Sequence, residues 1–215
     1  MRKNRFNKFV YCLLLLTLMI SFNVQAQEQS EEVEKASLTS QNSQYRRSDN
    51  IYQAWGDVEL DYQDSIIISQ NLEMRRDEDL FLFSEDVYLE QEEGDKIWSQ
   101  ELEFDLEADI MTARDEVRME AYRQDRYLEL ESEYLKLWLE TDDLLAEDNV
   151  VLFYDEQEIR GNRLEYEDAK EELVVTEEAE IKDDGDWMKA EKIVIDLAED
   201  IIDARNNVQL EFEID

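Results

Sequence analysis

Two short apolar patterns alternate along the chain from residue 51 to its end, and each pattern recurs about every 30 residues. In the first pattern, apolar or small residues at every second position lead to one Val or Ala. That residue recurs at Val58, Val87, Val117, Val150, Ala179 and Val208. In the second pattern, an apolar and a small residue are followed by two more apolar residues, as in Ile67, Ser69, Leu72 and Met74. The first pattern always resumes seven positions after the second ends, as from Met74 to Phe81. This constant offset restricts the fold to one structural unit that is copied along the chain.

The spacing of two within each pattern predicts β-strands with one buried face, and the many β-branched and aromatic residues agree. In the second pattern the alternation shifts by one position between Ser69 and Leu72. Such a shift predicts a bulge or corner, where the strand turns without reversing its apolar face. We therefore expect an all-β fold, a folded-over antiparallel sheet of about eleven bent strands whose halves face each other. A parallel β-solenoid with one coil per repeat is the alternative, and the acidic linkers between the patterns favour chain reversal over it.

The N-terminal segment has the features of an export signal. Arg2 and Lys3 open a basic start, Leu13 to Leu16 lie in an apolar stretch, and residues 24–26 resemble a signal-peptidase site. The apolar stretch, about 14 residues, is shorter than the ~20 residues of a spanning helix. We expect a signal peptide over 1–26, a flexible polar arm over 27–50 and one repeat domain over 51–215. A retained single-helix membrane anchor is the alternative. The only cysteine is Cys12, and an exported chain without other cysteines indicates a periplasmic protein.

The composition excludes several classes of function. Acidic residues number 58 against 22 basic ones, and the net charge is −36, so binding to nucleic acid is not expected. The chain has no histidine and only four glycines, and no glycine-rich phosphate loop is present. Among so many acids, neighbouring pairs such as Asp183 and Asp184 are more simply solvated surface than catalytic carboxylates. We therefore expect no enzymatic activity, no cofactor and no metal site.

Several elements resemble a known family. AWGDVEL (54–60), EDNVVLF (147–153) and ARNNVQLEF (204–212) resemble the recurrent strand of the OstA/LptA-like lipopolysaccharide-transport proteins. IRGNRLEYED (159–168) and MKAEKIVIDL (188–197) resemble its partner strand. The resemblance covers residues 51–215. It implies a twisted β-jellyroll that is open along one side and carries lipopolysaccharide or a related glycolipid through the periplasm toward the outer membrane. It also implies contact with other jellyroll transport proteins, or with copies of this chain head to tail, through the end strands.

On this resemblance, the inward apolar residues form the lipid groove as a class. They are Ile67, Leu72, Met74, Phe81, Phe83, Val87, Leu89, Ile97, Leu102, Phe104, Met111, Val117, Met119, Leu135, Leu137, Val150, Leu152, Leu164, Tyr166, Ile193, Ile195 and Val208. Alternation by itself favours a sealed core in which these side chains pack on one another, and only the family resemblance favours a groove. The competing hypotheses are therefore a self-assembling structural β-repeat scaffold of the envelope and a membrane-anchored, LptC-like partner of the transport system.

Overall fold

The computed structural model describes residues 36–62, 65–91, 94–123, 126–154, 157–183 and 185–211. The chain divides into two units, Met1–Glu34 and Lys35–Asp215, and every element described below belongs to the second. The expected signal peptide over 1–26 and the beginning of the expected arm lie outside the described residues.

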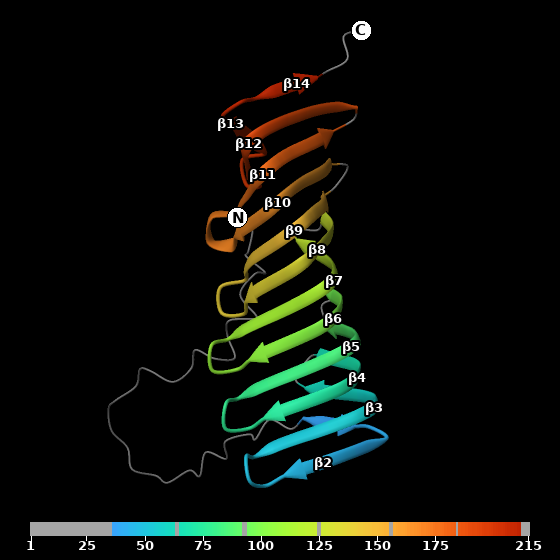
Figure 1. Ribbon diagram of the computed structural model, residues 1–215. Helices are drawn as coiled ribbons and strands as arrows, with labels where there is room; N and C mark the ends of the chain where they lie inside the picture. Colours follow the sequence, from blue (N-terminus) through green and yellow to red (C-terminus); the bar gives the residue numbers. More distant parts are fainter. Residues whose placement is uncertain are drawn as a thin grey trace, which may run out of the picture. The chain divides into compact units, whose positions relative to one another are not determined.

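The described part of the chain contains fourteen strands and one short 3-10 helix. The strands are β1 (Ser37–Thr39), β2 (Asn42–Arg46), β3 (Ile51–Tyr62), β4 (Ser65–Arg75), β5 (Leu80–Gln91), β6 (Lys96–Asp105), β7 (Ile110–Arg123), β8 (Arg126–Trp138), β9 (Asp143–Tyr154), β10 (Gln157–Glu167), β11 (Glu172–Asp183), β12 (Asp186–Asp196), β13 (Ile201–Arg205) and β14 (Gln209–Glu211), and the helix η1 (Asp168–Lys170) precedes β11. From β3 to β13, each strand pairs antiparallel with the next (Figure 1). The antiparallel meander is therefore confirmed, and the parallel solenoid is wrong.

The sheet extends further toward the N-terminus than the repeat does. β1 and β2 both pair with β3, in register with its second half and its first half respectively. Their residues lie within 27–50, where we expected a flexible arm. These strands carry few apolar residues, and all of their residues except Leu38 are exposed. Leu38 is partly buried against the core, and main-chain hydrogen bonds to β3 hold the rest. Apolar periodicity, the signal used to find the other strands, is absent here for that reason.

Each long strand bends at the same place in its repeat. In β3, β5, β7, β9 and β11, two consecutive residues have left-handed φ, and two such residues also separate β13 from β14. The pairs are Gly56–Asp57, Glu85–Asp86, Asp115–Glu116, Asp148–Asn149, Glu177–Glu178 and Asn206–Asn207. The register shifts beside them, so that Gly56 and Asp57 together lie opposite Gln70. The predicted corner is therefore present, but the extra residue of the bulge lies in the strand paired with it.

The other end of each repeat is a uniform turn. In the described ranges, six turns of four residues each end on a residue with left-handed φ. These residues are Asn50, Asp79, Asp109, Asp142, Glu171 and Asp200. Asn and Asp adopt this conformation more readily than other residues with a side chain. A turn of fixed length explains why the first pattern always resumes seven positions after the second, and the turns lie along one side of the stacked strands (Figure 1).

The small residues at the corners give the main chain room to approach. Ser69, Ser99 and Ser132 are buried, and each hydroxyl donates to the carbonyl oxygen two residues ahead, at 2.9, 2.9 and 3.0 Å. The corresponding residue of β10 is Gly161. A Cβ atom at Gly161 would lie 2.5 Å from Cγ1 of Val175 in the next strand, so the fourth corner is packed more tightly than a serine allows.

Candidate functional site

The row of bends divides the sheet into two limbs. We call the part of the strands between the bends and the four-residue turns the turn limb, and the part beyond the bends the far limb. Buried apolar side chains from both limbs form one continuous cluster, from Ala54 and Val58 in β3 to Ile193 in β12. Because the sheet folds over at the bends, one apolar face of one sheet becomes an interior between two limbs. The interior follows from the alternation by two combined with the bend.

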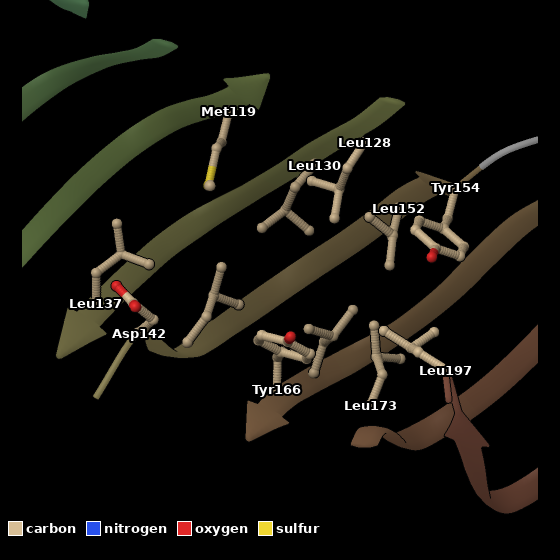
Figure 2. A pocket seen from close by; sticks show the side chains of 12 residues that line it. Met119, Leu128, Leu130, Leu137, Asp142, Leu152, Tyr154, Tyr166, Leu173 and Leu197 are labelled. Carbon is tan, nitrogen blue, oxygen red and sulfur yellow. The ribbon is translucent and has the colours of Figure 1, made fainter. Parts of the chain in front are cut away.

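A pocket lies between the limbs at the level of strands β7 to β11 (Figure 2). The far limb contributes Met119, Leu128, Leu130, Leu152 and Tyr154. The turn limb contributes Leu137, Leu144, Leu164, Tyr166 and Leu173, and two turns add Asp142 and Leu197. The cavity volume is about 40 Å³, which is room for only a few water-sized groups, since one water needs about 10–15 Å³. A longer apolar ligand therefore requires the two limbs to move apart.

The predicted groove residues fall into three groups by burial. Most are buried in the shared cluster, namely Ile67, Leu72, Phe83, Val87, Leu89, Ile97, Leu102, Met111, Val117, Met119, Leu135, Val150, Leu152, Leu164, Ile193 and Ile195. Phe81, Phe104, Leu137 and Tyr166 are partly buried against it, and Met74 is half-buried. Val208 lies apart from the others: it is 44% exposed and falls between Asn207 and β14. The chain leaves the regular alternation after β13, so the last copy of the pattern does not bury its Val.

The pocket brings together five of the predicted residues, and several of its lining residues were missed. The five are Met119, Leu137, Leu152, Leu164 and Tyr166. Leu128 and Tyr154 were missed because they continue the alternation beyond the repeated pattern, toward the ends of their strands. They lie opposite each other in the β8–β9 pairing. Asp142 and Leu197 come from turns, where a period of two carries no information about which side chains face inward.

The outer face of the far limb carries an aromatic and charged cluster. Trp98 lies opposite both Tyr88 and Arg118 in the strand register, on the face away from buried Ile97. Its ring lies 5.4 Å from that of Tyr88, and the Arg118 guanidinium carbon lies 5.1 Å from its centre. Arg118 Nε donates to Glu129 at 2.8 Å. Burial, together with the hydrogen bond to Glu90, raises the pKa of Tyr88 to about 12. Trp98 therefore faces outward, because it directly follows the inward-facing Ile97 in β6.

Two further observations concern membranes and metals. Within the ranges that the structure describes, no helix has both the length and the apolar character to cross a membrane. In the same ranges, no group of three or more acidic, cysteine or histidine side chains is arranged to hold a metal ion.

Comparisons with known proteins point to one family. The model of the LptA/(LptD N-terminal domain) lipopolysaccharide transport protein family matches residues 37–201, most of the chain. Among solved structures, the chain is similar to LptH from Pseudomonas aeruginosa, described as the LptA homologous periplasmic component of the conserved lipopolysaccharide transport device. That match has 11% identity and a TM-score of 0.27, and it covers 84% of this chain and 96% of LptH. No curated protein matches the chain.

Proposed function

Because the chain belongs to the LptA/(LptD N-terminal domain) family of lipopolysaccharide transport proteins, we propose that it holds the acyl chains of lipopolysaccharide, or of a related glycolipid, between its two limbs. In this role it is a bridge that carries the lipid toward the outer membrane and performs no chemical step. The observation that supports this most is the apolar pocket between the limbs, to which both limbs contribute side chains.

Burial of hydrocarbon is sufficient to hold such a lipid without a covalent bond. Each CH₂ group transferred from water to an apolar site contributes about 0.8 kcal/mol. Opening the limbs exposes leucine side chains that now contact one another, and the acyl chain replaces those lost contacts. The pocket includes Met119 and the partly buried Leu128 and Leu137. Side chains that are not locked on every side adapt to a flexible ligand at low cost.

We place the mature protein in the periplasm. The basic start with Arg2 and Lys3, the short apolar stretch and the small residue Ala26 support cleavage before Gln27. N-terminal sequencing of protein purified from its own envelope tests this proposal. A start at Gln27 supports the soluble bridge, and an intact N-terminus supports the membrane-anchored, LptC-like alternative.

The two edges of the sheet support contact with other jellyroll domains. At the C-terminal edge, Ile201, Val208 and Leu210 are 53%, 44% and 58% exposed. Proline, which blocks strand addition, is absent from the chain. Edges of this kind accept a further strand from a partner. A second copy of this chain, or another jellyroll transport protein, would extend the apolar interior from one domain into the next.

Substitution in the pocket, with a matched substitution on the outer face, tests the lipid-binding role. Leu137 lies in the pocket on β8, and Leu145 of β9 is outward-facing and likewise half-buried. We expect Leu137→Asn to lower lipid capture at least about fivefold, since it removes roughly 1 kcal/mol of apolar contact with the acyl chain. Leu145→Asn is expected to leave capture unchanged. Capture is measured by native mass spectrometry of protein from its own envelope, with the thermal midpoint as the folding control.

The same preparation separates the bridge from a structural scaffold. Wild-type protein that carries no lipid and forms a polymer with a sealed interior would reject the bridge and favour the scaffold. Equal loss of capture in the Leu137 and Leu145 variants would mean that capture follows stability and not the pocket.

A further inference from the structure

A second and larger hollow lies on the outer face of the turn limb. It extends from Trp138 at the end of β8 to Lys192 in β12, and we call it the outer hollow. Its volume is about 480 Å³, against about 40 Å³ for the pocket between the limbs. Clefts that bind small molecules commonly have about 300–1,000 Å³. The outer hollow therefore has room for a ligand without any movement of the limbs.

The outer hollow has apolar surface where the alternation predicts polar residues. Leu145 and Val174 lie on the outer face and line it, and both are half-buried. Leu145 pairs with Glu165, and Glu165 pairs with Val174, so these side chains form one row across β9, β10 and β11. Successive side chains of a strand lie on opposite faces, so these apolar residues contribute nothing to the interior. They are available to a ligand on the outer face.

An aromatic ring adds to this surface at one end of the hollow. Trp138 is half-buried and lines the hollow. The ammonium nitrogen of Lys136 lies 4.6 Å from the centre of its ring, and such a contact restricts the movement of the ring. Trp combines a large apolar surface with a polar N–H group. This combination suits a ligand that has both apolar faces and polar edges.

The polar side chains of the outer hollow are held in place by their own contacts. Arg163 Nε donates to Glu165 at 2.8 Å, and the Thr141 hydroxyl donates to Asp143 at 2.8 Å. All four residues line the hollow. A carboxylate accepts several hydrogen bonds, so Glu165 and Asp143 retain acceptor capacity for a ligand. Because these groups are already oriented, a ligand meets them without the cost of ordering them.

The charges of the outer hollow favour a ligand that has no net charge. Acidic side chains from β9, β10 and β11 line it together with the bases Arg163 and Lys192. Within the part of the chain that the structure describes, the Lys192 ammonium has no ion pair. The acids repel an anion, and the bases disfavour a cation. A hydroxyl group donates to a carboxylate and accepts from an ammonium or guanidinium group. A ligand rich in hydroxyl groups therefore satisfies both kinds of side chain.

We propose that the outer hollow is a binding site for an uncharged saccharide. The apolar faces of its sugar rings pack on Trp138 and Leu145, and its hydroxyl groups bond to Glu165 and Lys192. A peptide fits less well, because β8 to β12 are paired on both sides and leave no strand edge for a peptide to extend.

This inference goes beyond the lipid-binding role and does not depend on it. Leu144 and Tyr166 line both cavities, but these two residues are paired in the β9–β10 ladder. The hydrogen-bonded sheet therefore lies between the outer hollow and the interior. A saccharide bound on the outer face leaves the space between the limbs accessible to lipid.

The test measures dissociation constants by isothermal titration calorimetry on protein purified from its own envelope and dialysed. The neutral probes are maltotetraose, cellotetraose and chitotetraose, and tetragalacturonate and tetralysine serve as an anionic saccharide and a cationic peptide. The site variant is Trp138→Ala. Its matched control is Trp98→Ala, which removes another half-buried Trp from the outer face, in β6. Leu145→Asn is the second site variant, and thermal midpoints are the folding control.

We expect wild-type protein to bind at least one neutral tetrasaccharide with a dissociation constant of about 1 mM or lower. Trp138→Ala should weaken that binding at least about tenfold, which corresponds to about 1.4 kcal/mol, and Trp98→Ala should leave it unchanged. Leu145→Asn should also weaken saccharide binding. Because this variant is expected to keep its lipid capture, it separates the two sites in one protein.

Three results would overturn the saccharide site. They are no detectable binding of any neutral tetrasaccharide, equal losses in the Trp138 and Trp98 variants, and tighter binding of tetragalacturonate or tetralysine than of every neutral probe. The lipid-binding role is tested by lipid capture alone, so its failure and the failure of the saccharide site are distinguishable.

Discussion

The corner at Gly161 allows the packing of the repeat to be tested by one substitution. We consider Gly161→Ser, which introduces the residue that occupies three other corners. The new Cβ would lie 2.5 Å from Cγ1 of Val175 and 3.0 Å from the Thr176 carbonyl oxygen. The first of these distances is too short for any non-bonded pair of carbon atoms, and both contacts are to β11. The strand pair must therefore separate or Val175 must change its position.

The expected loss of stability follows from two opposing effects. Overpacking of a buried site costs about 1–3 kcal/mol. Replacing glycine reduces the conformational entropy of the unfolded chain, and this stabilises by about 0.4–1 kcal/mol. The free energy of unfolding should therefore fall by about 1–2 kcal/mol. Urea denaturation measures it, and an unchanged m-value with a lower midpoint would indicate that only stability has changed.

A second substitution identifies the cause of the loss. Val175→Ala beside Gly161→Ser recreates the combination of Ser132 with Ala146, which are the corresponding residues of β8 and β9. Val175→Ala alone removes two methyl groups from a fully buried site and costs roughly 1–2 kcal/mol. The double variant should lose clearly less than the sum of the two single losses. Wild-type stability of Gly161→Ser, or losses that simply add, would refute the steric explanation.

Two more predictions concern the bends and the ion pairs. Glu178 has a φ of 68°, so Glu178→Gly should raise the free energy of unfolding by up to about 1 kcal/mol because it relieves left-handed strain. Glu180→Gly, in the extended part of the same strand, should lower the free energy of unfolding. Equal effects of the two substitutions in urea denaturation would contradict the explanation by strain. The hydrogen bond from Arg75, assisted by Gln53, lowers the pKa of Glu73 below its ordinary value of 4.5. A carboxylate with a lowered pKa stabilises the folded protein at a pH above the ordinary pKa, and this stabilisation is lost as the pH falls through the pKa of the folded state. The difference in free energy of unfolding between wild type and Glu73→Gln should therefore shrink on acidification, and a constant difference would contradict this.

The long strands and their order could be predicted from the sequence because alternation by two is a local signal. The apolar positions from Phe81 to Leu89, for example, indicate which face of β5 is buried. The parity shift between Ser69 and Leu72 likewise predicted the bend. The reason is the pleat itself, since every second side chain lies on the same face whatever the rest of the sheet does.

Alternation by two could not predict the polar strands β1 and β2 or the residues that line the pocket. β1 and β2 are held by main-chain pairing with β3, and main-chain hydrogen bonds leave little mark on residue type. The inward position of Asp142 and Leu197 depends on how the turns approach the opposite limb.

The amino-acid sequence by itself therefore determined the repeated unit, the face of each long strand that is buried and the place where each strand bends, because these depend on neighbours within a few residues. The tertiary structure alone decided how closely the two limbs approach and which residues of β7 to β11 and of the turns enclose the pocket. These properties arise between side chains such as Met119 and Leu173, which are far apart in the chain and line one pocket only after the sheet has folded over.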